Sequence, residues 1–332
     1  MAARLKVAIS FLCVIFLISC GSNETPKVTV YVSADEQIAR TVFNLFTERT
    51  GIEVLWVGDT ESSKTTALVQ RLIREKTNPV ADVFWSSEII GTINLADEDV
   101  LTSYTSEVAE KWPTNNRDDK YRWFGFSPRA RVIAYDPTRT KTTDLPSMWW
   151  EYDQAAMADP RFGTTGTHLA VMSTFPEQYD KFTNKVKGNY LLGGNAATVR
   201  AVVNGLVEFA MTDTDDVHAA KENGASIEMY YPRHHEGEGG GTLLIPNTVA
   251  IINGCNHPDL AGTFVDFMLS DEVAIVLARS PSHNIPLQGH LAKQFPELVV
   301  EDPLVIDFAK AAEMHKKIMP SIIDTLLGSN EK

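Results

Sequence analysis

Short apolar runs alternate with longer stretches of helical periodicity from residue 28 onward. The pattern of the N-terminal part predicts the order strand, helix, strand, helix, strand, because β-branched runs are separated by segments whose apolar side chains recur every three or four positions. These elements span residues 28–32, 35–50, 52–57, 63–75 and 80–85 in that order. Such an order requires right-handed crossovers between parallel strands. The pattern therefore predicts an α/β fold.

The alternation continues, less regularly, toward the C-terminus. Strands are predicted at 131–135, 208–212, 226–231 and 248–252, and helices within 144–156, at 196–206, 215–223, 258–269 and 272–278, and between 305 and 327. About 300 residues of this pattern exceed what one compact core organises well. We expect two lobes, each a mixed, mostly parallel sheet flanked by helices.

Polar side chains follow three of the predicted strands. They are Ser33 and Asp35 after the first strand, Ser86 and Ser87 after the third, and Asp213, Asp215 and Asp216 after the strand at 208–212. Any one of them could simply cap the helix that follows. Ligands of open α/β sheets bind at the carboxyl ends of the strands, so the three together predict a polar binding cleft.

The net charge and the absence of common catalytic motifs argue against several classes of function. The chain has 30 Lys and Arg against 43 Asp and Glu, a net charge of −13, which argues against nucleic-acid binding. No Walker A, G-x-S-x-G or H-E-x-x-H motif is present, and no G-x-G-x-x-G opens a strand–helix unit. The segment 234–241 carries His234, His235, Glu236 and Glu238, but the spacing favours a solvated loop tip over a metal site.

The N-terminal residues have the pattern that is typical of a targeting segment. Arg4 and Lys6 precede about a dozen apolar residues, and Leu17-Ile18-Ser19-Cys20-Gly21 resembles the bacterial lipobox. We therefore expect a signal peptide at 1–19, lipidation of Cys20, a tether at 20–26, and a body held by its lipid at a membrane in the periplasm or at the cell surface. Cys255, the one cysteine of the body, is expected to be a small buried apolar residue near a strand end.

Several segments, in their order, carry a family resemblance. They are Ala81-Asp82-Val83-Phe84-Trp85-Ser86 and the stretches 123–135, 159–165, 241–252 and 264–270. Together they resemble the extracytoplasmic solute-binding proteins of ABC importers, in the branch that holds ferric-ion-binding and thiamine-binding proteins. The resemblance implies a monomeric receptor that catalyses no reaction and delivers its cargo to a membrane permease.

The same resemblance implies the two-lobed type II periplasmic-binding-protein fold, with the ligand cleft between the lobes and hinge strands near 131–135 and 246–252. Lobe 1 would comprise residues 27–131 and 247–285, and lobe 2 residues 132–246 and 286–332. Closure of such lobes around a buried solute is a known hinge motion.

The identity of the transported solute follows less directly from the sequence than the receptor class does. Ferric-binding members use a His or Tyr after the first strand and two adjacent tyrosines in the second lobe; here those positions hold Asp35 and the acidic segment 212–216. Tyr230 and Tyr231 are adjacent in a strand-like run, so their side chains should point to opposite faces. The carboxylates of Asp35, Asp213, Asp215 and Asp216 could still form an oxygen-only site for a hard cation such as Fe³⁺, Ca²⁺ or Mn²⁺, or could receive the ammonium or hydroxyl groups of an organic solute.

An anion could be held beside that cation. The turn at 162–167, with Thr164 and Thr165, offers backbone N–H groups ahead of a helix, and Arg129 matches the hinge arginine of the family. Two cargoes therefore remain open: iron(III) with a small anion, or a small phosphorylated or phosphonate organic solute. No cofactor is expected other than Fe³⁺ as transported ligand.

A third hypothesis keeps the same fold but assigns a different function, that of a secreted enzyme or a sensor domain. In an enzyme, Asp215→Asn would lower turnover while ligand affinity is kept. In a transport receptor the same substitution would lower affinity, and there would be no turnover to lose.

Overall fold

The computed structural model describes residues 25–59, 65–152, 155–161, 163–185 and 191–327. The predicted signal peptide, the lipidation site Cys20 and most of the tether lie outside the described residues. No helix in the described part of the chain is long and apolar enough to cross a membrane.

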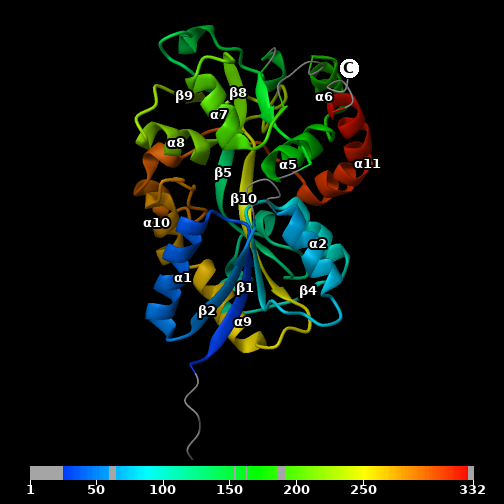
Figure 1. The fold of residues 1–332 in the computed structure, drawn as a ribbon, viewed down its shortest axis with the longest axis vertical. Helices are drawn as coiled ribbons and strands as arrows, with labels where there is room; N and C mark the ends of the chain where they lie inside the picture. Colours follow the sequence, from blue (N-terminus) through cyan, green and yellow to red (C-terminus); the bar gives the residue numbers. More distant parts are fainter. Residues whose placement is uncertain (1–24, 60–64, 153–154, 162, 186–190, 328–332) are drawn as a thin grey trace, which may run out of the picture.

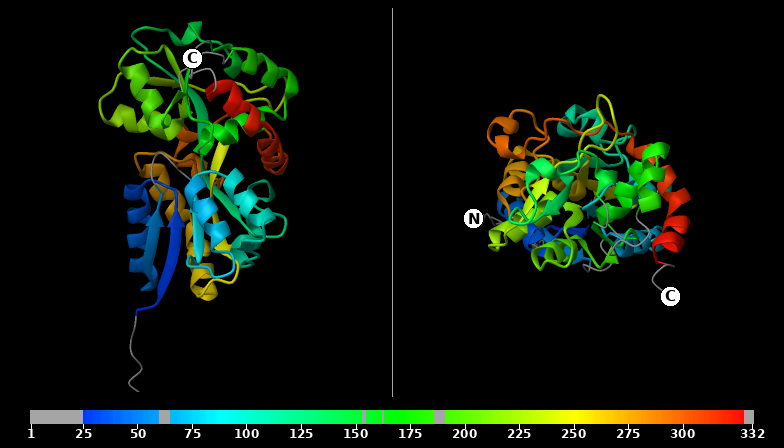
Figure 2. Two further views of the ribbon diagram at one scale, coloured as in Figure 1. Left: turned by 45° about the vertical axis from the view of Figure 1, so that its right-hand side comes forward. Right: turned by 90° about the horizontal axis from the view of Figure 1, so that it is seen from above.

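Two lobes lie one above the other and share one continuous sheet (Figure 1). The strands of the described residues follow the order β2-β1-β3-β10-β5-β8-β6-β7, with β4 beside β10 and β9 beside β5. Helices flank both halves of the sheet (Figure 2). The predicted α/β class with two lobes is therefore confirmed.

Lobe 1 contains the predicted strand–helix repeat. The strands β1 (Lys27–Val32), β2 (Glu53–Gly58) and β3 (Val83–Ser86) are parallel, with β1 in the middle. Between them run α1 (Glu36–Thr50), which ends at Gly51 in the left-handed conformation, and α2 (Thr66–Arg74). The remaining elements are α3 (Ile90–Asp97), β4 (Leu101–Thr102), α4 (Glu107–Lys111), α9 (Pro258–Met268) and α10 (Asp271–Arg279).

Lobe 2 is built around β8 (Phe209–Asp213), which lies between β5 and the short parallel strand β6 (Ala156–Ala158). Its other elements are α5 (Gly163–Met172), α6 (Pro176–Lys185), β7 (Leu191–Leu192), α7 (Asn195–Val203), α8 (Thr214–Glu222) and β9 (Glu228–Tyr230). The helix expected within 144–156 is wrong: the described residues of that segment form no α-helix, only the 3₁₀ turn Trp149–Glu151 and the end of another, Thr142–Asp144. Pro146 lies between them and disfavours a continuous helix.

Two long strands pass between the lobes. In β5 (Phe124–Tyr135) the residues up to Ala130 pair with β10, whereas Arg131 to Tyr135 pair with β8. The partner strand β10 (Leu244–Ile252) also pairs with β3 of lobe 1. Its register shifts at Pro246, which has no N–H to donate to the ladder. The change of partner at Ala130 puts the neighbouring side chains of β5 at the junction of the two lobes.

The C-terminal helix α11 (Phe308–Leu327) runs beside both lobes on one side of the molecule (Figure 1). Ala311 and Ala312 belong to one buried cluster with side chains of α3 in lobe 1 and with Ala170 and Val171 of α5 in lobe 2. The lobes are thus joined by apolar packing on the α11 side, in addition to the two strands. Residues 286–332 were assigned to lobe 2 from the resemblance, and that boundary stays a prediction.

Candidate functional site

A cleft of about 880 Å³ lies between the lobes. Lobe 1 lines it with the segment from Ser33 to Ile38, at the junction of β1 and α1, and with Trp85 and Ser87 at the end of β3. Lobe 2 lines it with the first turns of α5, α7 and α8, and the crossing strands contribute Arg129 and Asn247. The carboxyl ends of the strands of both lobes therefore meet at one cavity, as the polar strand ends predicted.

The wall of lobe 1 is a cluster of hydroxyl groups. Ser33 Oγ accepts hydrogen bonds from the backbone N–H of Ser87 (2.8 Å) and from Thr65 Oγ1 (3.0 Å), and lies 3.2 Å from Ser87 Oγ. Ser86 instead is fully buried away from the cleft, where its Oγ accepts from the N–H of Glu88. Alternation of side chains along β3 explains why Ser87 lines the cleft and Ser86 does not.

Asp35 stands directly before α1 with an extended backbone, and its side chain makes no capping hydrogen bond to the helix. It lines the cleft on the lobe 1 side. The simple explanation of this carboxylate as a helix cap is therefore not supported by the geometry.

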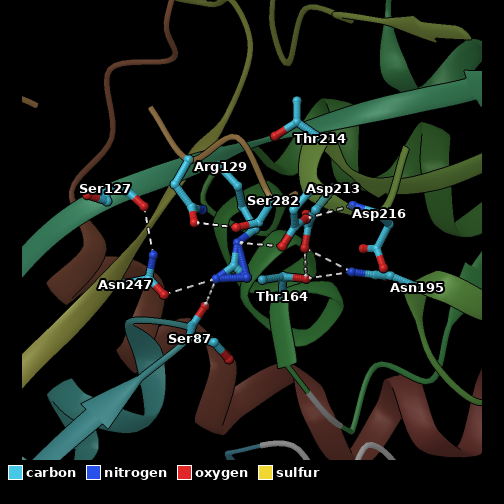
Figure 3. A network of polar contacts seen from close by, with 12 residues as sticks. Ser87, Ser127, Arg129, Thr164, Asn195, Asp213, Thr214, Asp216, Asn247 and Ser282 are labelled. Atoms are coloured by element: carbon cyan, nitrogen blue, oxygen red, sulfur yellow. Dashed lines mark hydrogen bonds and ion pairs between the residues drawn. The ribbon is translucent and has the colours of Figure 1, made fainter. Parts of the chain in front are cut away.

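Arg129 connects the two lobes at the base of the cleft. Its Nη2 donates to the Ser87 carbonyl (3.0 Å) and to Asn247 Oδ1 (3.2 Å), and its Nε lies 3.4 Å from Asp215 Oδ2. Figure 3 shows the contacts of the guanidinium group with Ser87 and Asn247. Burial alone would lower the pKa of Arg129, but the nearby carboxylates, Asp215 foremost, outweigh it and raise that pKa. The group is a permanent cation at the cleft.

A second network lies deeper in lobe 2. The Asp213 carboxylate accepts hydrogen bonds from Arg131 Nη1 (2.9 Å), Thr164 Oγ1 (2.5 Å) and Asn195 Nδ2 (2.8 Å). Figure 3 shows the contacts with Thr164 and Asn195. Arg131 and Asp213 are each 1% exposed. Sequence reasoning passed over Arg131 and Asn195. An arginine inside the apolar run Ala130 to Tyr135 is itself a signal, because a buried charge needs a partner.

Asp215 and Asp216 occupy the first turn of α8 and are partly exposed to the cleft. Carboxylates are favoured at this position by the partial positive charge of a helix N-terminus. Asp215 Oδ1 accepts the N–H of Asp216 (3.1 Å), and Asp216 Oδ2 lies 3.4 Å from Thr212 Oγ1. One oxygen from each of Asp213, Asp215 and Asp216 falls within 4.8 Å of the others.

The first turn of α5 faces the same space. Thr164 and Thr165 line the cleft, and Thr165 is 1% exposed. Within the described residues, Thr165 Oγ1 has no hydrogen-bond partner. A buried hydroxyl without a partner is uncommon and indicates a group that a ligand could satisfy.

Two expectations, about the adjacent tyrosines and about Cys255, can be compared with the geometry. Neither Tyr230 nor Tyr231 lines the cleft; Tyr230 packs on the lobe 2 core, and Tyr231 borders a separate cavity of about 280 Å³. Cys255 is only partly buried, and it lies after the end of β10.

The interpretation of His234 as part of a solvated loop tip is wrong. Its side chain is fully buried and its Nε2 lies 3.0 Å from His168 Nε2, while its Nδ1–H donates to the Gly241 carbonyl. Trp149 packs against both imidazoles. Burial lowers the pKa of His234 to about 3 and that of His168 well below its usual value, and the charge of Arg131 adds to both effects.

Comparison with known proteins identifies the family. The model of the bacterial extracellular solute-binding proteins matches residues 22–275, and the chain belongs to that family. The major ferric iron-binding protein of Neisseria meningitidis is 25% identical over 314 residues, covering 88% of this chain and 90% of the relative. A putative 2-aminoethylphosphonate-binding periplasmic protein of Salmonella typhimurium is 24% identical over 284 residues, covering 80% of each.

Among solved structures, a ferric binding protein from Campylobacter jejuni superposes with a TM-score of 0.78 at 21% identity, covering 91% of this chain and 99% of that one. This likeness extends over both lobes and confirms the periplasmic-binding-protein fold. The assignment to solute-binding proteins of ABC importers, in the branch with iron-binding relatives, is likewise confirmed.

Proposed function

We propose that this solute-binding protein captures iron(III) together with a small anion in the cleft between its lobes and delivers them to an ABC permease. The observation that carries the proposal is the charge of the cleft. Among the described residues that line it, one side chain is a permanent cation, Arg129, and eight are acidic: Asp35, Glu36, Asp59, Asp159, Asp213, Asp215, Asp216 and Glu222. Some of these carboxylates are paired with arginines, as Asp213 is with Arg131 and Asp215 with Arg129, and an excess of acidic groups remains. Such a wall attracts cations and repels a ligand that is purely anionic.

The cation would be held from both lobes. Asp215 and Asp216 supply carboxylate oxygens from α8, and Asp35 supplies one from the junction of β1 and α1. Hard trivalent and divalent cations prefer oxygen ligands of this kind. Because ligands would come from two lobes, cation binding would also favour lobe closure.

The anion would lie at the first turn of α5. Helix N-termini present free N–H groups to an anion, and Thr165 Oγ1 is a buried hydroxyl without a partner in the described part of the chain. Arg129 is close enough to the cleft to pair with the same anion. A cation with its counter-anion would thus use both the acidic and the N–H-rich surfaces of the cleft.

One alternative cargo has its own support, a small organic phosphonate or phosphate ester that carries an ammonium group. The anion position would receive the phosphonate, and the carboxylates of α8 would receive the ammonium. A relative named as a putative 2-aminoethylphosphonate-binding protein matches most of the chain. In either case we propose a receptor rather than an enzyme or sensor, in which Asp215→Asn lowers affinity and affects no turnover.

Two titrations distinguish between the two proposed cargoes. The mature body, residues 21–332, is titrated with ferric nitrilotriacetate in phosphate buffer and, separately, with 2-aminoethylphosphonate. We expect saturable uptake of one iron per chain and no saturation by the phosphonate. Because no tyrosine lines the cleft among the described residues, the loaded protein should lack a tyrosinate-to-iron absorption band. Saturation by 2-aminoethylphosphonate alone would overturn the iron assignment.

We also propose that the receptor is a monomer anchored by lipid at Cys20, with lobe 1 at 27–131 and 247–285 and lobe 2 at 132–246 and 286–332. The lipobox-like segment supports the anchor, and the change of strand partner within β5 supports the first boundary.

A further inference from the structure

Asp213 differs from the other acidic residues of the cleft in how its oxygens are used. Oδ1 accepts from Arg131 Nη1, and Oδ2 accepts from both Thr164 Oγ1 and Asn195 Nδ2. Three donors within 2.9 Å occupy a carboxylate that is 1% exposed. These donors take up three of the roughly four acceptor positions of a carboxylate, so little of this group is left to coordinate a cation.

The three donors come from three different elements. Arg131 is on the crossing strand β5, Thr164 on the first turn of α5, and Asn195 is the first residue of α7. Thr164 Oγ1 also accepts from Asn195 Nδ2 (3.0 Å), so the two helix starts are linked directly as well. The Asp213 carboxylate therefore fixes where the N-termini of α5 and α7 point.

Arg131 compensates the buried charge of Asp213. Its Nη1 donates to Asp213 and lies 3.3 Å from Thr164 Oγ1. A buried ion pair of this kind is strongly disturbed when one partner is removed, because the other charge is left uncompensated. The Asp213–Arg131 pair thus carries no net charge and both members are 1% exposed, whereas Asp215 and Asp216 are partly exposed to the cleft.

We propose that Asp213 and Arg131 are a positioning pair that does not coordinate the cargo, and that they align the first turns of α5 and α7 as hydrogen-bond donors to its anionic part. The inference rests on the proposed function for the identity of the cargo. It removes Asp213 from the set of cation ligands that the acidic segment 212–216 predicts, and leaves Asp35, Asp215 and Asp216.

The test compares Asp213→Asn with Asp215→Asn, a neighbouring carboxylate changed in the same way. Iron affinity is measured by competition with nitrilotriacetate at fixed phosphate, and iron release is followed during acidification. We expect Asp213→Asn to lower iron affinity by less than tenfold, through weaker binding of the phosphate, and to leave the pH of half-release unchanged. Asp215→Asn should lower affinity more than a hundredfold. Half-release should move to higher pH, because a site that lacks one ligand holds iron more weakly and less acid is needed to release it.

Amide hydrogen exchange of the unloaded protein reports the positioning role. In Asp213→Asn, the amides of the second turns of α5 and α7, the first to be hydrogen-bonded within each helix, should exchange at least tenfold faster than in the unmodified chain, whereas in Asp215→Asn they should not change. Equal loss of iron affinity in both variants, or unchanged exchange in Asp213→Asn, would overturn the inference.

If Asp213→Asn does not fold, the double variant Arg131→Met/Asp213→Asn removes both charges together and should still bind iron within tenfold. If the unmodified chain takes up no iron, the proposed cargo is wrong, and the exchange comparison still decides whether Asp213 aligns the two helices.

Discussion

The Glu88 carboxylate of lobe 1 accepts a hydrogen bond of 2.9 Å from the hydroxyl of Thr167 in lobe 2, and both side chains are buried. Glu88 also accepts the N–H groups of Ile90 (2.6 Å) and Gly91 (2.8 Å) at the start of α3. Burial raises the pKa of Glu88 even though these donors oppose the change. The Glu88 carboxylate thus accepts the first N–H groups of α3 and also joins the two lobes, on the side where α11 packs against both.

Removing the hydroxyl of Thr167 should destabilise the fold. Thr167→Val deletes a hydrogen bond to a buried carboxylate and leaves that group less well satisfied, at a cost of about 2 kcal/mol in the free energy of unfolding. Urea denaturation measures it. Thr165→Val is a matched control on the same helix, since its hydroxyl has no partner in the described residues. If both variants lose the same stability, the Glu88–Thr167 contact contributes nothing specific.

The His168–His234 pair should make the protein sensitive to acid. Because both pKa values are lowered in the folded state, the unfolded chain binds more protons below about pH 6.5, and stability falls as pH decreases from there. For His234 the loss is about 1.4 kcal/mol per pH unit down to its folded pKa of about 3.

His234→Gln tests this origin of acid sensitivity, since an amide can still donate to the Gly241 carbonyl but does not titrate. Between about pH 7.5 and 5, this variant should lose roughly 2 kcal/mol less than the unmodified chain in urea denaturation. His290→Gln, at an exposed histidine, should behave like the unmodified chain. An unaltered pH profile in His234→Gln would show that acid sensitivity arises elsewhere.

Asp215 and Asp216 should be required for stabilisation by cargo. A ligand at a hundredfold excess over its Kd adds about 2.7 kcal/mol to the folded state, which is readily measured as a rise in Tm. Asp215→Ala/Asp216→Ala should abolish the rise produced by ferric iron with phosphate. Asp144→Ala, at an exposed carboxylate outside the cleft, should retain it. A retained rise in the double variant would remove both residues from the site.

Cys20 should determine attachment to the membrane. With Cys20→Ser the lipobox lacks its acyl acceptor, so the protein should move from the detergent phase to the aqueous phase of a Triton X-114 partition. The intact chain should remain in the detergent phase and carry a mass increase on its first residue after processing. Aqueous partitioning of the intact chain would contradict the lipoprotein assignment.

The sequence predicted the fold well where local pattern and tertiary packing agree. The β-branched run at 28–32 and the periodic segment ending at Gly51 each formed the element expected, because the strand is buried on both faces and the helix on one. The helix within 144–156 failed because Trp149 and Trp150 are buried by neighbours that are distant in sequence, which local periodicity does not reveal.

The candidate site was predicted in part for a similar reason. Strand ends could be located from periodicity, and this brought Ser33, Asp35 and Asp215 to the cleft lining. What could not be predicted was pairing across the fold. Asn195 and Arg131 meet Asp213 only after three elements pack together, and His234 reaches His168 over 66 positions of sequence.

The central claim is that the acidic cleft carries a metal ion with an anion, and native mass spectrometry of the protein purified from its own envelope tests it most directly. The native mass is compared with the denatured mass of the same preparation. We predict an excess equal to one iron, with or without a small anion such as phosphate, lost on treatment with a chelator. An excess of an organic solute without iron, unaffected by the chelator, would contradict the claim.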